Sequence, residues 1–190
     1  ECQRGNYEKG LADYNTALVA DPENQMVQYD VKRISVLCRC ATLKAEGDQH
    51  FAAQELEEAV KSYSAALDLD EGFVSCVSNR AACYLALGQA ERCVDDCTTA
   101  LSLLQVKANP MQMLPTGPVP AVGSAKRRQW VLKTLVRRGT ANSSLSKFKD
   151  ACEDFRQAVK LDPENEGLKG DLAQLEEAME AEEEEVDGLD

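Results

Sequence analysis

Residues 74–107 read VSCVSNRAACYLALGQAERCVDDCTTALSLLQVK, and this stretch decides the fold. Small residues recur in it at helical spacing around Tyr84 and Leu101, namely Ala81, Gly88, Cys93, Cys97 and Ala100. Two short helices that pack closely across a turn at residues 87–89 require small side chains at such positions. The stretch therefore predicts one helical hairpin.

The same residue classes recur along the chain with a period of 34 residues. Residues 40–73 and 132–165 carry full copies, while residues 1–24 match only the back half of the unit. This pattern resembles the tetratricopeptide repeat, which implies an all-α solenoid of stacked helical hairpins. We expect one partial and three full repeats, followed by a C-terminal capping helix.

The connection between the partial repeat and the first full repeat has two interpretations. Residues 25–52 contain no proline, and their first glycine is Gly47. One long helix can run from the first hairpin into the second. Alternatively, a capping helix near residues 25–37 ends at a break around Cys38 to Cys40. The periodicity does not decide between them.

A proline-rich segment interrupts the period between the last two full repeats. Residues 108–131 hold four of the six prolines and end with Lys126-Arg-Arg128 and the single tryptophan. Pro115-x-x-Pro118 fits a polyproline ligand, and the basic triplet fits an acidic partner. The simpler interpretation is a loop followed by an early start of the next helix.

The predicted organisation is a partial repeat with a connecting helix at 1–39, two full repeats at 40–107, an inserted loop at 108–131, a third full repeat at 132–165, a capping helix at 166–180 and an acidic tail at 181–190.

The charge is concentrated at the C-terminal end. Residues 166–190 hold 11 Asp or Glu and one Lys, so most of the net charge of −12 lies there. We expect the run beyond Glu180 to be solvated and disordered. A net acidic chain argues against nucleic-acid binding. No apolar run is long enough to span a membrane and no signal peptide precedes the first repeat, so we expect a soluble cytoplasmic protein without membrane contact.

The eight cysteines do not indicate a metal site or disulfides. Cys83, Cys93, Cys97 and Cys152 fall on positions where the repeat needs a small apolar residue. The spacings Cys38-x-Cys40 and Cys93-x-x-x-Cys97 are not those of zinc sites, and His50 is the only histidine. No Ser-His or Cys-His pair suggests a nucleophile. We therefore expect no metal, no cofactor and no enzyme activity, but a protein or peptide ligand in the concave groove of the repeats.

The three full repeats resemble the chaperone-binding tetratricopeptide domains, which hold the C-terminal carboxylates of Hsp70 and Hsp90 in a clamp. Lys44, Asn79, Lys133 and Arg137 stand where that family has Lys, Asn, Lys and Arg. Asp48 stands where the family has Asn, and it would set a like charge beside a bound carboxylate. Such a clamp is weakened, altered in specificity or vestigial. Alternatively, these residues are ordinary solvated positions.

Residues 40–178 also resemble the C-terminal repeats of the p23-TPR dynein axonemal assembly factors, including the site of the inserted loop and the long final helix. That resemblance implies assistance to chaperones in assembling axonemal dynein arms, in the cytoplasm or at the cilium and axoneme. Two functions stay open. The chain is either a co-chaperone adaptor for an Hsp70 or Hsp90 tail, or a structural scaffold in a ciliary or other large assembly.

Overall fold

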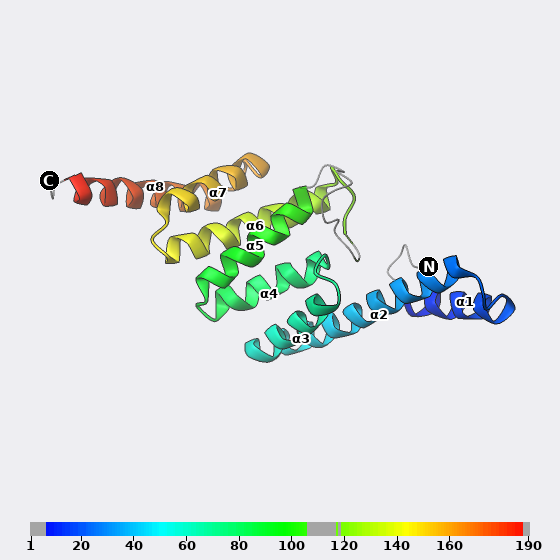
Figure 1. The fold of residues 1–190 in the computed structure, drawn as a ribbon. Helices are drawn as coiled ribbons and strands as arrows, with labels where there is room; N and C mark the ends of the chain where they lie inside the picture. The colour runs from blue at the N-terminus through cyan, green and yellow to red at the C-terminus, as the bar shows by residue number, and fades with distance from the viewer. Residues whose placement is uncertain (1–6, 106–116, 118, 188–190) are drawn as a thin grey trace. The chain divides into compact units, whose positions relative to one another are not determined.

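The computed structural model describes residues 7–105, 117 and 119–187, with side chains up to residue 182 (Figure 1). Over these residues the chain forms eight helices and no strand, which confirms the all-α prediction. The helices are α1 (Tyr7–Ala20), α2 (Gln25–Ala52), α3 (Leu56–Leu69), α4 (Val74–Ala86), α5 (Ala90–Gln105), α6 (Ala125–Ser144), α7 (Phe148–Leu161) and α8 (Glu166–Asp187).

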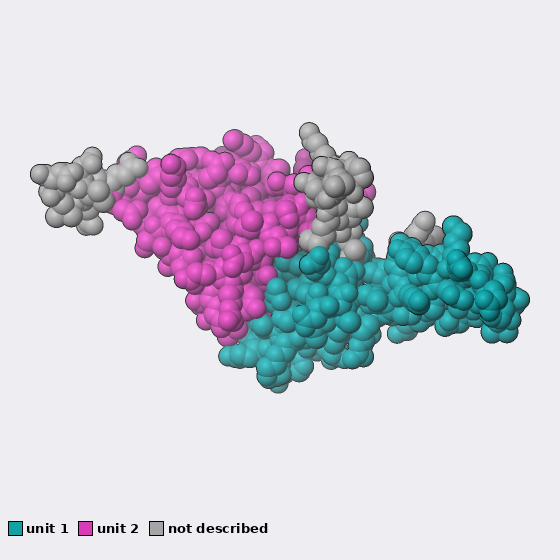
Figure 2. Space-filling view, viewed as in Figure 1, with its two compact units in different colours: residues 1–80, 106–119 teal, residues 81–105, 120–190 magenta. Residues whose placement is uncertain are grey.

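The helices belong to two compact units (Figure 2). Unit 1 comprises residues 1–80 and 106–119, and unit 2 comprises residues 81–105 and 120–190. Helix α4 contributes its residues up to Arg80 to unit 1 and the rest to unit 2.

In unit 1, α2 is one continuous helix that packs against both α1 and α3. The structure therefore has the first of the two connections that the sequence left open. Asn24 caps its N-terminus, since the Asn24 side chain accepts a hydrogen bond from the Val27 amide at 3.1 Å. No residue of α2 before Gly47 breaks a helix. Its buried residues Cys40, Leu43 and Gly47 share one face, whereas the buried Ile34 lies on a different face of the helix.

Glycines set the closest helix contacts inside both units. A Cβ placed on Gly47 would lie 2.6 Å from the Tyr63 ring on α3, and one on Gly139 would lie 2.7 Å from the Phe155 ring on α7. Tyr63 and Phe155 are themselves buried. In these two repeats a glycine of the first helix thus packs against an aromatic ring of the second helix.

In unit 2, α8 covers the last hairpin through buried Leu168 and Leu175, in one cluster with Phe155 of α7. The prediction of a disordered run beyond Glu180 is wrong for the described part, because α8 continues to Asp187. Glu and Ala are good helix formers, and the next glycine is Gly188.

Helix α6 begins at Ala125, inside the segment predicted as a loop, and Ser124 caps it. The Arg127 side chain is buried and donates to the carbonyls of Leu104 and Pro120, both at 2.9 Å. The basic triplet is therefore not one exposed patch, because the side chain of its middle residue, Arg127, is buried and hydrogen-bonded inside unit 2. Residues 115, 116 and 118 of the predicted polyproline motif lie outside the described residues.

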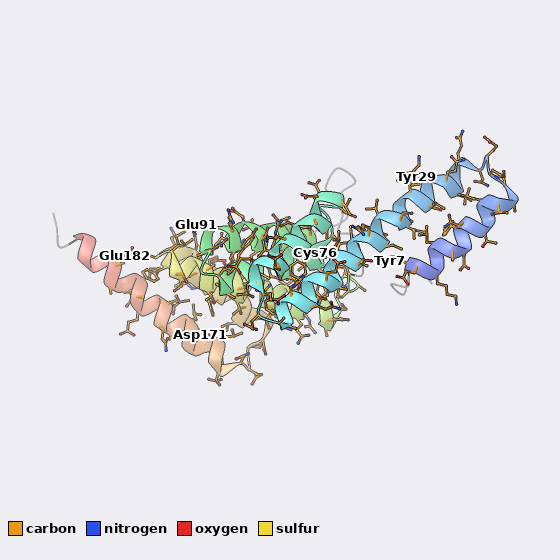
Figure 3. All side chains as sticks on the ribbon, turned by 90° about the horizontal axis from the view of Figure 1, so that it is seen from below. Tyr7, Tyr29, Cys76, Glu91, Asp171 and Glu182 are labelled. Atoms are coloured by element: carbon orange, nitrogen blue, oxygen red, sulfur yellow. The ribbon has the colours of Figure 1, made fainter. Side chains whose placement is uncertain are left out.

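The seven cysteines within the described residues are thiols outside any disulfide, and six of them are buried. Cys83, Cys93, Cys97 and Cys152 each have 0% exposure, so their prediction as packing residues is confirmed. Burial raises the pKa of the Cys40 thiol to about 11. Figure 3 contrasts the buried Cys76 with Tyr29, whose side chain on α2 is 67% exposed.

Candidate functional site

Three of the predicted site residues meet in unit 1. Lys44 and Asp48 lie one turn apart on α2, and their Nζ and Oδ2 atoms are 2.5 Å apart. The other oxygen of Asp48, Oδ1, accepts from Asn79 Nδ2 of α4 at 2.9 Å and from the Tyr63 hydroxyl of α3 at 2.7 Å. Tyr63 is not among the predicted site residues. Its hydroxyl makes it a fourth member of this polar group.

The carboxylate of Asp48 already holds one donor each of Lys44 and Asn79, the groups that would donate to a ligand carboxylate. The side chains of Lys44 and Asp48 are 26% and 44% exposed, so a ligand can reach the group. A second carboxylate about 4 Å from Asp48 would be repelled by roughly 1–4 kcal/mol at a protein surface. Burial raises the pKa of the neighbouring Cys76 thiol to about 12, so Cys76 is uncharged at neutral pH and does not add to this repulsion.

The other two predicted residues line a groove in unit 2. Lys133 and Arg137 lie one turn apart on α6, with Lys133 exposed and Arg137 half-buried. They border an open groove of about 360 Å³ whose remaining lining residues are mostly apolar, namely Leu85, Leu132, Val136, Thr140, Asn165 and Leu168. Two cations beside an apolar wall fit an anionic group that is followed by an aliphatic side chain.

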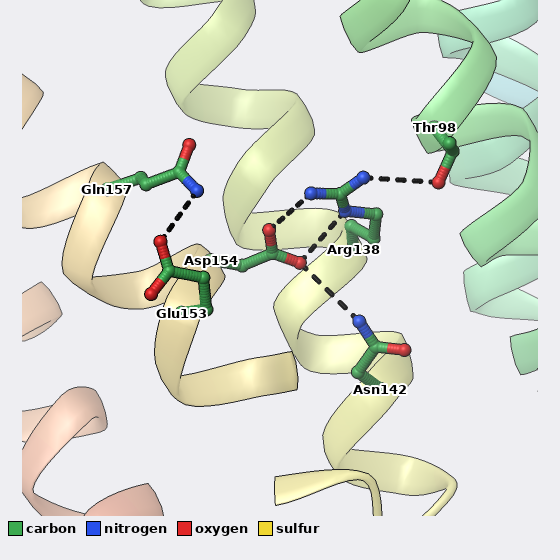
Figure 4. A network of polar contacts seen from close by, with 6 residues as sticks. All are labelled: Thr98, Arg138, Asn142, Glu153, Asp154 and Gln157. Carbon is green, nitrogen blue, oxygen red and sulfur yellow. Dashed lines mark hydrogen bonds and ion pairs between the residues drawn. The ribbon is translucent and has the colours of Figure 1, made fainter. Parts of the chain in front are cut away.

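A buried ion pair holds α6, which carries these cations (Figure 4). The Arg138 guanidinium donates to both oxygens of Asp154 on α7, at 2.6 and 2.9 Å, and to the Thr98 hydroxyl on α5 at 3.1 Å. Asn142 adds a contact of 3.5 Å to Asp154. The bond to Asp154 raises the pKa of Arg138. Sequence reasoning missed this pair, although an aspartate among the packing positions of α7 is a signal that could have found it.

The adjacent residues Arg137 and Arg138 therefore have different surroundings. Arg138 is committed to the packing of α5, α6 and α7, whereas Arg137 borders the groove. The structure thus brings Lys44, Asp48 and Asn79 together in unit 1, and Lys133 and Arg137 together in unit 2.

Within the described residues, no three His, Cys, Asp or Glu side chains are grouped so that they could hold a metal ion. Among the helices that the structure describes, none has the length and apolar character needed to cross a membrane.

The helical hairpins, with their glycine and aromatic contacts, define a helical-repeat protein. The family model of the tetratricopeptide repeat matches residues 132–165, so this part of the chain is a tetratricopeptide repeat. Dynein axonemal assembly factor 4 of Rattus norvegicus is 30% identical over 133 residues, which cover 70% of this chain and 28% of that protein. The chain thus spans less than a third of the length of this relative.

Two tetratricopeptide domains of RPAP3 proteins are among the solved structures that are similar to the chain. The second tetratricopeptide domain of human RPAP3, in complex with the HSP70 peptide SGPTIEEVD, is 25% identical with a TM-score of 0.57, over 74% of this chain and 98% of that one. The first such domain of Spaghetti (RPAP3), bound to the HSP90 peptide SRMEEVD, is 22% identical with a TM-score of 0.57. The match covers 74% of this chain and 93% of that one, and at this identity it shows only that the folds are similar. The repeat family is a protein-interaction module.

Proposed function

We propose that the chain is a co-chaperone adaptor that binds the C-terminal peptide of an Hsp70 or Hsp90 chaperone. The observation that carries this proposal is the pair Lys133 and Arg137 beside the apolar groove of α6. The RPAP3 domain whose complex contains an HSP70 peptide, and the assembly factor of axonemal dynein, support it by similarity. We place the adaptor in the cytoplasm, with axonemal dynein for the cilium as the assembly that it serves.

In this proposal Arg137 and Lys133 donate to the carboxylate of the peptide. A guanidinium can bind a carboxylate with two parallel hydrogen bonds, whereas an ammonium acts as a point charge. The apolar wall formed by Leu132, Val136 and Leu168 takes the aliphatic side chain next to that carboxylate. Water leaves this apolar surface on binding, which stabilises the complex.

The polar group of unit 1 lowers the affinity of the adaptor for a ligand carboxylate. Asp48 neutralises Lys44 and occupies a donor of Asn79. Asp48→Asn removes the like charge and frees the ammonium, so we expect this variant to bind a peptide with a free carboxylate more tightly than the wild type.

Fluorescence anisotropy of a labelled peptide tests this function. The peptide SGPTIEEVD is titrated with a free and with an amidated C-terminus against the wild type, Lys133→Ala, Arg137→Ala and Asp48→Asn. Loss of a charged hydrogen bond costs roughly 1.5–3 kcal/mol, so we expect each alanine variant to bind about 10-fold to 150-fold more weakly. Lys149→Ala, which removes an exposed cation of α7, is the matched control. Equal affinity for the free and amidated peptides would contradict the proposal.

A structural scaffold is the second candidate, and exposed apolar side chains in unit 1 favour it. Val19, Met26 and Tyr29 are 83%, 80% and 67% exposed on α1 and α2. Such residues can pack against partner helices. A chain that binds no carboxylate peptide even as Asp48→Asn, and that loses incorporation into axonemal dynein assemblies as Met26→Ser/Tyr29→Ser, would support the scaffold.

A further inference from the structure

Helix α6 carries only basic charges. Its 20 residues contain six Lys or Arg and neither Asp nor Glu. It starts seven residues before the repeat unit at 132, so it presents additional side chains N-terminal to Lys133 and Arg137. This extension exists because the helix begins inside the segment that interrupts the period.

The packing of unit 2 divides these cations into two sets. Arg127 and Arg138 are held by carbonyls and by Asp154 and are not available to a ligand. Lys126, Lys133 and Arg137 follow one another at intervals of seven and four residues, which places them on one stripe of an α-helix. Trp130 lies on the same stripe, half-buried between Lys126 and Lys133, while Lys126 and Lys133 are exposed. We call these four residues the α6 stripe.

The dimensions of the stripe indicate its ligand. Seven residues of helix separate Lys126 from Lys133, or roughly 10 Å along the axis. An extended peptide covers that distance in about three residues. A peptide whose carboxylate lies at Lys133 and Arg137 would therefore bring a side chain about three residues upstream to Lys126. The positive charge of Lys126 favours Asp or Glu there, and the Trp130 ring offers apolar surface between the two ends.

We propose that the α6 stripe extends the groove of unit 2 and binds acidic side chains that precede the C-terminal carboxylate of a peptide. The inference rests on the proposed function, because it takes Lys133 and Arg137 as the place of that carboxylate. It adds Lys126 and Trp130 as the residues of this chain that contact the peptide upstream of its terminal carboxylate.

Arg128 provides a matched control for the stripe. It is an exposed cation of the same helix, two residues from Lys126 and on the opposite side of α6. Lys126→Ala and Arg128→Ala remove the same charge from the same turn of the helix. A general effect of net charge on an acidic peptide would therefore appear in both variants, and a local contact only in Lys126→Ala.

The experiment titrates the wild type and both variants with SGPTIEEVD and with SGPTIQQVD, which retains the terminal carboxylate. An exposed ion pair contributes roughly 0.2–1 kcal/mol, so we expect Lys126→Ala to weaken binding of the acidic peptide about 1.5-fold to 5-fold. It should leave the affinity for the glutamine peptide unchanged, and Arg128→Ala should change neither. Trp130 is the only tryptophan, so its intrinsic fluorescence should change as the acidic peptide binds to the unlabelled chain.

The outcomes separate the two proposals. Carboxylate-dependent binding with equal effects of Lys126→Ala and Arg128→Ala would overturn the stripe and leave the proposed function standing. Equal wild-type affinity for the acidic and the glutamine peptides would also overturn the α6 stripe and leave the proposed function standing. Absence of carboxylate-dependent binding in the wild type and in Asp48→Asn would overturn both.

Discussion

Arg138→Met measures how strongly the ion pair with Asp154 holds α6 against α7. The carboxylate of Asp154 is 2% exposed and accepts two hydrogen bonds from the guanidinium, at 2.6 and 2.9 Å. Without Arg138 it keeps Asn142 at 3.5 Å. Breaking a buried ion pair from one side costs roughly 3–5 kcal/mol because a charge stays buried without its partner. The Arg138 side chain is 22% exposed, so water can reach the site. We expect a loss near the lower limit, about 3 kcal/mol.

Urea denaturation followed by circular dichroism gives the free energy of unfolding for the wild type, Arg138→Met, Asp154→Leu and the double variant. A loss of about 3 kcal/mol corresponds to a decrease in Tm of roughly 6–12 °C for a chain of this size. The double variant should recover part of the loss, because neither charge is then buried alone. A loss below about 1 kcal/mol, as exposed pairs give, or strictly additive losses would refute the reasoning.

Three further predictions concern stability. Gly139→Ala places a Cβ 2.7 Å from the buried Phe155 ring, so overpacking should outweigh the gain in helix propensity and cost roughly 1–2 kcal/mol, whereas Gly170→Ala, with open space around it, should gain up to about 1 kcal/mol in the same denaturation assay. The pKa of Cys76 is raised from 9.0 to about 12, so the folded state holds this proton more tightly. The contribution of Cys76 to the free energy of unfolding should therefore be constant below about pH 9 and be lost between about pH 9 and 12, so the fall in this range should be shallower in Cys76→Ala. Ser124→Ala removes the N-cap of α6 and should cost about 1 kcal/mol, with faster amide exchange in the first turn; a loss as small as that of Ser124→Gly, a few tenths of a kcal/mol, would contradict a capping role.

The fold was predictable because its determinants are local and periodic. Small residues recur at the repeat spacing, and two of them, Gly47 and Gly139, lie against the Tyr63 and Phe155 rings at the same offset within their repeats. The ends of elements were harder to predict. The sequence indicated an early start of the helix after the proline-rich segment, but only Ser124, in a capping position, marks the start of α6 at Ala125.

The candidate site was predictable in its residue types but not in its contacts. The sequence indicated an adverse charge at Asp48, and the structure shows that this carboxylate is bonded to Lys44, Asn79 and Tyr63. That arrangement depends on side chains from three helices, which no local pattern relates.

By itself, the sequence determined the class of fold, the order of the hairpins and the residue types available to a ligand, because these follow from a period that each repeat carries within itself. Only the tertiary structure decided which charges are available. Arg127 and Arg138 turn into unit 2, whereas Lys126 stays exposed and Lys133 and Arg137 border a groove. The physical reason is that a basic side chain has the same charge anywhere in a sequence, and its availability depends on the carboxylates and carbonyls that folding brings beside it.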